Sequence, residues 1–226
     1  RKESSAASDV YKRQTVGGSI SVNCHGWDFR KGTIANTIKE LTIINPKGEL
    51  VLLSPTHPLF HYVIGGYGCF GIIVEAKILL TDNCAITEIS KELPLDKYID
   101  YFHTEVENTP NILMHRYRLS VHSKDFFQSG IATNYIKSGS ANVISNLPAT
   151  HPKEKLLLKS LRFIRKSPRA KDFIYKLAKK SVLKKTVSTR NEVMSPPMQF
   201  HFTKQKNTAD WLQEFFIPEE EFEDFI

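Results

Sequence analysis

Short apolar runs separated by glycine and polar residues dominate the chain from residue 15 to residue 83. Leu41–Ile44 and Glu49–Leu53 are rich in β-branched and aliphatic residues, and Asn45–Gly48 lies between them. Because Pro at the second position and Gly at the fourth favour a type I turn, this pattern predicts a β-hairpin. Val16–Val22 and Ile72–Leu80 are predicted as further strands.

The pattern changes after Asn83. Apolar residues recur at helical spacing from Leu95 to Val106, directly behind Pro94, which suits a helix start. Further on, the pattern predicts strands at Ile112–Val121, Ile131–Ile136 and Trp211–Ile217, and a basic helix over Leu156–Leu183 that is interrupted at Ser167-Pro168. The sequence therefore predicts an α+β fold with a domain boundary near residues 82–90.

Composition excludes several classes of protein. The chain has 226 residues, 41% of them hydrophobic, and its longest apolar run is the four residues Leu50–Leu53. That run is too short for a transmembrane helix or a secretory signal. Cys24, Cys69 and Cys84 lack the spacing of a disulfide framework or a zinc site, so we expect a cytoplasmic protein without a bound metal.

The positive charge is confined to one segment. Residues 151–190 hold fourteen Lys or Arg and two acids, a local charge of +12 within a chain whose total is +7. Three hypotheses fit this segment: a solvated helix that buries its other side, an interfacial helix on anionic lipid, and a nucleic-acid-binding surface. The last is disfavoured because no nucleic-acid-binding motif accompanies the charge.

The first fourteen residues are set aside. Ser4–Gln14 resembles the translation of an adapter used in sequencing-library preparation, so residues 1–14 are expected to be a non-native tail. The native sequence would then start in mid-domain near Thr15, and the helical pattern at Phe222–Ile226 would be cut short.

One glycine loop matches a dinucleotide-binding motif, but the residues that follow it do not fit that motif. Gly66–Gly71 matches the GxGxxG pattern of dinucleotide-binding βαβ units, which require a helix directly after the loop. Ile72–Val74 is β-branched and predicts a strand instead. The Rossmann interpretation is therefore rejected, and the glycines point to backbone amides that approach a ligand from several loops.

Several motifs follow one another in a recognisable order. They are Thr15–Gly18, Asn23–Gly26, Gly32-Thr33, the Pro-Lys-Gly hairpin and Gly65–Ile73. This order resembles the second half of the FAD-binding domain of the vanillyl-alcohol-oxidase, or PCMH-type, family. The similarity is greatest to sugar-oxidising members such as decaprenylphosphoryl-ribose, sugar-lactone and alditol oxidases. Arg190–Pro197 and Leu212–Pro218 are also similar to segments of bacterial FAD-linked oxidases.

The resemblance implies FAD as cofactor and a set of residues beside it. The implied cofactor-binding residues are Thr15, Val16, Gly17, Gly18, Val22, Asn23, Cys24, His25 and Ile73, with Gly26, Gly32, Thr33 and Asn36 in the adjoining segment. Some members attach FAD covalently through a histidine, but that residue usually lies in the other half of the domain. No covalent link is therefore predicted through His25.

The resemblance also implies the domain organisation. Residues 15–83 would be the C-terminal subdomain of the FAD-binding domain, and residues 84–226 part of a substrate, or cap, domain with an antiparallel sheet. Gln213 and Glu214 are the candidate catalytic residues, and their side chains would lie on opposite faces of a strand, so at most one faces the flavin. Arg116 and Arg118 share one face, where they either hold an anionic group or are solvated.

The predicted function is that of an FAD-dependent oxidoreductase. It would oxidise a CH–OH group of a sugar, polyol or lipid-linked sugar by hydride transfer to the flavin. Two alternatives stay open: an FAD-dependent double-bond reductase of the sterol-reductase type, and a non-enzymatic basic module that binds lipid or nucleic acid. The favoured partners are the substrate and an anionic membrane contacted through residues 151–190, without nucleic acid.

Overall fold

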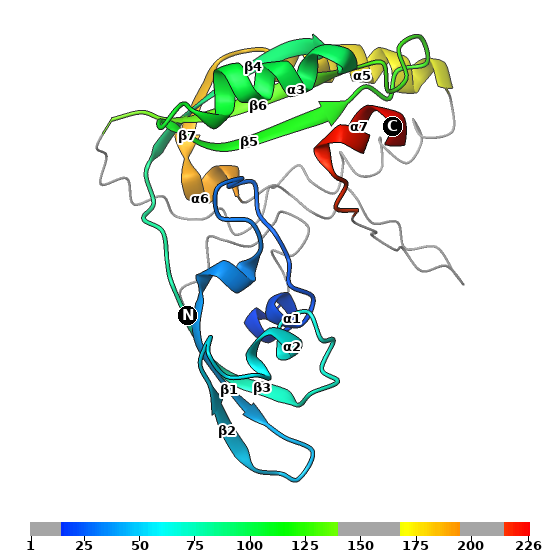
Figure 1. Cartoon of the computed structure of the whole chain (residues 1–226). Coiled ribbons are helices and arrows are strands. Elements are labelled where there is room, and N and C mark those ends of the chain that lie inside the picture. Colours follow the sequence, from blue (N-terminus) through cyan, green and yellow to red (C-terminus); the bar gives the residue numbers. More distant parts are fainter. Residues whose placement is uncertain (1–14, 140–167, 195–214) are drawn as a thin grey trace. The chain divides into compact units, whose positions relative to one another are not determined.

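A computed structural model describes residues 15–139, 168–194 and 215–226 of the chain (Figure 1). It contains two compact units, and each is described by itself. Unit 1 comprises residues 1–83 with Arg190–Pro196, and unit 2 comprises Cys84–Thr189 with Pro197–Ile226. The predicted α+β class with antiparallel sheets is confirmed.

Unit 1 contains a three-stranded antiparallel sheet in the order β2-β1-β3. The strands are β1 (Ile38–Ile44), β2 (Leu50–Leu53) and β3 (Ile72–Ile78). The predicted hairpin is confirmed: Leu41 pairs with Leu53 and Ile44 with Leu50. Asn45 closes its turn, because the Asn45 side-chain oxygen accepts hydrogen bonds from the backbone N–H groups of Lys47 and Glu49.

Two short helices complete the core of unit 1. They are α1 (Val16–Ser21) and α2 (Phe60–Val63). Ile20 of α1 and Phe60 and Val63 of α2 pack with Leu41 and Ile43 of β1. The sequence predicted a strand at Val16–Val22, and this prediction is wrong. The Thr15 hydroxyl caps a helix there by accepting a hydrogen bond from the Gly18 N–H at 3.1 Å.

Unit 2 contains a four-stranded antiparallel sheet in the order β5-β6-β4-β7. Its strands are β4 (Ala85–Pro94), β5 (Ile112–Leu119), β6 (Ser129–Lys137) and β7 (Thr186–Thr189). The predicted strands at β5 and β6 are confirmed, whereas β4 and β7 were not predicted. Tyr135 and Met114, at 1% and 0% exposure, are among the buried side chains of this unit.

Helices lie on both faces of this sheet. The helix predicted behind Pro94 is confirmed as η3 (Leu95–Lys97), α3 (Tyr98–Tyr101) and the π-helix η4 (Phe102–Glu107). Lys91 of β4 lies over the Tyr101 ring of α3, with 5.1 Å between Nζ and the ring centroid. Its neighbour Glu92 pairs with Lys179 of α5 (Pro168–Val182). Because consecutive strand residues point to opposite faces, α3 and α5 lie on opposite sides of the sheet.

The described C-terminal parts test two further predictions. The second part of the helix predicted over Leu156–Leu183 is confirmed as α5, which begins at the predicted interruption, whereas residues 156–167 lie outside the described residues. Helix α6 (Arg190–Val193) follows β7. The predicted strand Trp211–Ile217 is wrong where it is described, because Phe215–Ile217 has no strand structure. The chain then forms η6 (Glu219–Glu221) and α7 (Phe222–Phe225), which agrees with the helical pattern predicted there. Among the described residues, no helix has the length and hydrophobicity needed to cross a membrane.

Candidate functional site

Three stretches of unit 1 that are distant in the sequence meet at α1. The Gly65 and Tyr67 N–H groups donate to the carbonyl oxygens of Ile20 and Ser21, both at 3.0 Å. The Ile34 N–H donates to the Cys24 carbonyl at 2.8 Å. The segments 15–26, 32–36 and 65–73, which hold the predicted cofactor-binding residues, therefore form one continuous region.

The start of α1 is exposed to solvent. The first N–H groups of a helix have no acceptor within the helix, and the Thr15 hydroxyl satisfies one of them, that of Gly18. Thr15 and Val16 are exposed, and Gly17 is half-buried. A Cβ atom added to Gly17 would meet the Ile73 carbonyl oxygen at 3.9 Å and nothing nearer. The α1 start thus lies beside β3.

Gly17 offers a test of whether a cofactor fits. Its φ is outside the left-handed region, and the space beside it is open. A glycine inside a helix costs about 0.5–1 kcal/mol relative to alanine, and no contact in the described part of unit 1 requires one here. A flat or anionic group that approaches the backbone closely would require it. The residues present therefore fit FAD in kind: small side chains, helix-start N–H groups and a neighbouring apolar strand.

Residues 22–24 are held in place by contacts within unit 1. Cys24 is 1% exposed and packs in the hydrophobic core with Ile20 and Ile34. Asn23 has a positive φ of 48°, and its side-chain oxygen accepts a hydrogen bond from the Ala35 N–H at 3.3 Å. Val22 packs against the same core. The Cys24 side chain therefore packs in the core, and its backbone N–H and carbonyl are paired with Ser19 and Ile34.

The adjoining loop is held together by its own contacts. His25 forms an isolated β-bridge with Thr33, and the His25 Nδ1 atom lies 3.2 Å from the carbonyl oxygen of Gly26. The Asn36 side chain donates to the Lys31 carbonyl at 2.8 Å across Gly32. These contacts give Gly32 and Asn36 a role in shaping the loop, whether or not a ligand is bound.

The glycine loop from residue 65 to residue 71 has a structural explanation of its own. A Cβ atom on Gly66 would lie 2.1 Å from the Tyr62 carbonyl oxygen, and one on Gly71 would lie 2.6 Å from the Ile44 carbonyl oxygen. Strand β3 begins at Ile72, immediately after the loop. The rejection of a Rossmann phosphate loop is therefore confirmed, because no helix follows these glycines.

Arg190 belongs to unit 1 and was missed as a site residue. Its guanidinium is 4% exposed, and Nη2 lies 3.4 Å from the Asp28 carboxylate. Arg190 Nε has no hydrogen-bond partner within the described chain. Next to it, the Asn191 N–H donates to the Asn83 side chain at 3.0 Å. In the sequence, Arg190 ends the basic segment and begins the oxidase-like segment Arg190–Pro197, but sequence spacing gave no signal that it pairs with Asp28.

The predicted catalytic residues Gln213 and Glu214 lie outside the described residues. Arg116 and Arg118 do share one face of β5, as predicted, because their register partners are Thr133 and Ile131 of β6. The Arg116 guanidinium lies 5.7 Å from the centre of the Tyr135 ring, so it packs on the sheet.

The other face of β5 carries a buried polar cluster that the sequence did not indicate. His115 Nδ1 lies 2.7 Å from the Asn134 side-chain oxygen, and the Asn134 amide donates to the Tyr101 hydroxyl at 2.8 Å. Burial lowers the pKa of His115, so the imidazole is neutral and its Nδ1–H donates to Asn134. Tyr98 stacks on Tyr117 with 4.1 Å between ring centroids. This cluster fastens α3 to the sheet.

About one third of the chain is similar in sequence to known proteins. No family model matches the chain. Cytokinin dehydrogenase 3 of Oryza sativa subsp. japonica is 39% identical over 75 residues, which are 32% of this chain and 14% of the relative. Cytokinin dehydrogenases 2 and 4 of Arabidopsis thaliana are 42% and 41% identical over 73 residues, 31% of this chain and 15% and 14% of the relatives. Such relatives are FAD-binding flavoproteins.

Over that stretch the chain is similar to FAD-linked oxidoreductases. The chain spans about one seventh of the length of these curated relatives. The predicted cofactor class thus agrees with the relatives, whereas the predicted site residues stay predictions.

Proposed function

We propose that this chain is part of an FAD-dependent oxidoreductase, and that unit 1 is the second half of a PCMH-type FAD-binding domain. The similarity to cytokinin dehydrogenases carries the proposal, because about 40% identity over some 75 residues reflects common ancestry. The matched stretch is also about as long as the segment from Thr15 to Asn83. The meeting of the glycine-containing segments at α1 supports the proposal independently.

The residues of unit 1 would bind and orient the cofactor. N–H groups at the start of α1 suit an anionic or carbonyl edge, and Gly17 allows that edge to approach the backbone. Ile73 is half-buried beside Gly17 and supplies an apolar wall. When bound, FAD would supply the hydride-accepting chemistry. The protein would contribute position, exclusion of water and hydrogen bonds.

The proposed substrate is a CH–OH group of a sugar, polyol or lipid-linked sugar. This choice rests on the resemblance of the motif series to sugar-oxidising members of the family. The relatives' names point to cytokinins instead. Cytokinin is not the substrate proposed for this chain, because the shared stretch is only 13–15% of each relative. Unit 2 would be part of the substrate domain, with Gln213 or Glu214 near the reacting group.

A visible absorption spectrum of the purified full-length gene product tests the proposal. Bound flavin bands are expected, and sugars or polyols should bleach them anaerobically. Bleaching by a cytokinin alone would move the substrate to that of the relatives. Reoxidation of reduced flavin by an alkene would favour the reductase of the sterol-reductase type. A folded protein that neither retains nor binds FAD would leave the non-enzymatic basic module as the remaining hypothesis.

A further inference from the structure

Helix α5 is attached to unit 2 through a small set of polar contacts. The Asp172 carboxylate accepts hydrogen bonds from the Ser123 hydroxyl at 2.6 Å and from the Ser123 N–H at 3.2 Å. One turn later the Tyr175 ring lies 5.9 Å from the His122 ring, and Lys179 pairs with Glu92 at 2.5 Å. The positions 172, 175 and 179 thus define the side of α5 that contacts the sheet.

A neighbouring strip of α5 is exposed to solvent. It carries Phe173, Lys176 and Lys180, again at intervals of three and four residues, and Phe173 is 63% exposed. Residues 183–185, which follow the helix, again combine lysines with an exposed apolar residue. We call the whole set the basic surface: Phe173, Lys176, Lys180, Leu183, Lys184 and Lys185. Leu183 is 38% exposed.

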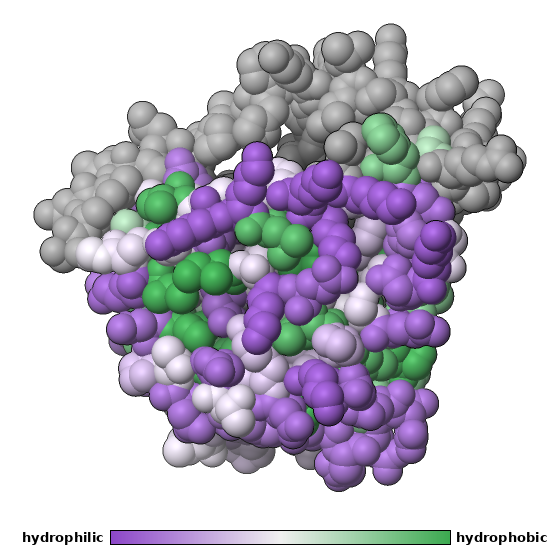
Figure 2. All heavy atoms as spheres, turned by 90° about the horizontal axis from the view of Figure 1, so that it is seen from above, coloured by the Kyte–Doolittle hydropathy of each residue, from purple (hydrophilic) through white to green (hydrophobic). Residues whose placement is uncertain are grey.

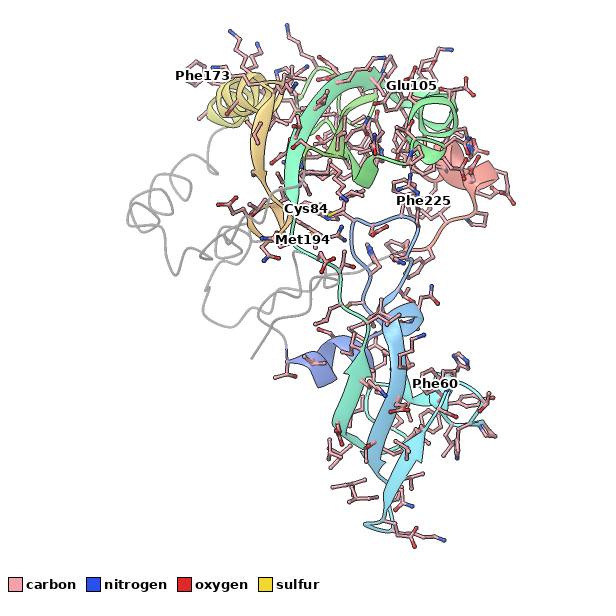
Figure 3. The ribbon with its side chains drawn as sticks, turned by 90° about the vertical axis from the view of Figure 1, so that its left-hand side faces the viewer. Phe60, Cys84, Glu105, Phe173, Met194 and Phe225 are labelled. Carbon is pink, nitrogen blue, oxygen red and sulfur yellow. The ribbon has the colours of Figure 1, made fainter. Side chains whose placement is uncertain are left out.

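The basic surface lacks acidic neighbours along its own chain. Asp172 is the one acid in the sequence from residue 168 to residue 189, and its carboxylate is bonded to Ser123. Two other acids of unit 2, Glu107 of η4 and Glu219 of η6, flank His103 next to α3, whereas Glu92 on the α5 side is paired with Lys179. Figure 3 shows Glu105 and Phe173 at opposite sides of unit 2. Figure 2 looks onto this unit and shows hydrophobic patches among the hydrophilic side chains.

We propose that the basic surface binds anionic lipid at a membrane surface, with Phe173 entering the headgroup region. Lysines attract anionic headgroups, and exposed Phe and Leu side chains gain free energy by leaving water for the acyl boundary. A nucleic acid would satisfy the lysines but would leave Phe173 and Leu183 in water. The mixture of charge and apolar exposure therefore favours lipid, independently of the proposed flavin chemistry.

Co-sedimentation of the 226-residue protein with vesicles tests this proposal. The vesicles are phosphatidylcholine with about 30% phosphatidylglycerol, and pure phosphatidylcholine is the comparison. Binding is expected to the anionic vesicles at low salt and to fall steeply as salt is added, because salt screens the lysines. The double variant K176Q/K180Q should bind about 30-fold more weakly, since each lysine near an anionic surface contributes roughly fivefold. F173S should lose roughly tenfold while keeping the salt dependence.

The matched control is K39Q/K47Q, which removes two exposed lysines from unit 1 and should bind like the unmodified protein. Circular dichroism verifies that all variants are folded. Absence of binding to anionic vesicles at low salt would overturn the proposal, as would equal binding by K176Q/K180Q and the control. Salt-sensitive binding of an RNA or DNA oligonucleotide without vesicle binding would assign the surface to nucleic acid. None of these measurements depends on bound flavin, so failure here leaves the proposed function untouched.

Discussion

At the scale of single residues, the glycines of unit 1 divide into two kinds. Gly66 and Gly71 are required by the fold, because a side chain would overlap the carbonyl oxygens of Tyr62 and Ile44. Gly17 is not required in this way, since its nearest neighbour would be 3.9 Å from an added Cβ. The sequence alone cannot separate these cases, because each glycine is a single letter whose neighbours come from distant segments. Gly17 is therefore the more informative residue for function.

Replacing Gly17 by alanine should move stability and cofactor affinity in opposite directions. Alanine in α1 should stabilise the fold by about 0.5–1 kcal/mol, since it reduces the freedom of the unfolded chain without a clash. The same methyl group should weaken FAD binding in the full-length protein, because it occupies the space beside the backbone N–H groups. Urea unfolding and flavin titration measure the two effects. Unchanged FAD affinity in a stabilised variant would remove Gly17 from the proposed site.

At the scale of elements, prediction from sequence succeeded where periodicity was strong. The β1-β2 hairpin, β3, β5, β6 and the helix behind Pro94 were all predicted, because each has a β-rich run, a recognisable turn or a periodic apolar pattern. The prediction failed at α1, where Gly-Gly and small residues mimic a strand edge while the deciding contact is the Thr15 cap. Strand β4 was missed because Thr, Glu, Ser and Lys interrupt its apolar residues, although Ile86 and Leu93 are buried.

The candidate site could be predicted only as a set of segments. Motif order brought together residues 15–26, 32–36 and 65–73, and the structure joins them through backbone hydrogen bonds. The motif order could not reveal that the Cys24 side chain packs in the core, or that Arg190 pairs with Asp28. Those facts depend on tertiary contacts between residues up to 162 positions apart, which no local pattern encodes.

His103 links two elements of unit 2 in a pH-dependent way. Its ring nitrogens lie 2.6 Å from a carboxylate oxygen of Glu219 in η6 and 2.7 Å from one of Glu107 in η4. Hydrogen bonds to Glu219 and then to Glu107 raise the pKa of His103 to about 9. Because this value exceeds the ordinary pKa of about 6.5, the link is fully present below pH 6.5. It is lost as the pH rises through about 9.

NMR titration should therefore show the His103 ring and the backbone amides of Phe222 and Phe225 changing together, with a midpoint near pH 9. The variant H103Q should lose this transition, since a glutamine amide does not titrate. H61Q, which replaces an exposed histidine of unit 1, should retain it. A His103 midpoint near 6.5 would show that the two carboxylates do not hold the charged ring in solution.

At the scale of the whole molecule, the described residues form two separate hydrophobic cores. Leu41 lies in the core of unit 1 and Met114 in that of unit 2, and both side chains are 0% exposed. Each unit also has its own sheet, and no strand in the described ranges belongs to both sheets. A chain organised in this way should not unfold in a single cooperative step. Instead, a substitution in one core should lower the unfolding transition of the unit that contains it.

Two core substitutions should separate these transitions. In a W211F background Trp27 fluorescence reports on unit 1, and near-ultraviolet circular dichroism of the stacked Tyr98 and Tyr117 reports on unit 2. M114A should lower the unit 2 transition, because truncating a buried methionine costs about 2–5 kcal/mol, and should leave the Trp27 transition in place. L41A should have the reverse effect. If either variant shifted both signals equally, the two cores would be coupled in one cooperative fold, and ligand binding in unit 1 would then stabilise unit 2 as well.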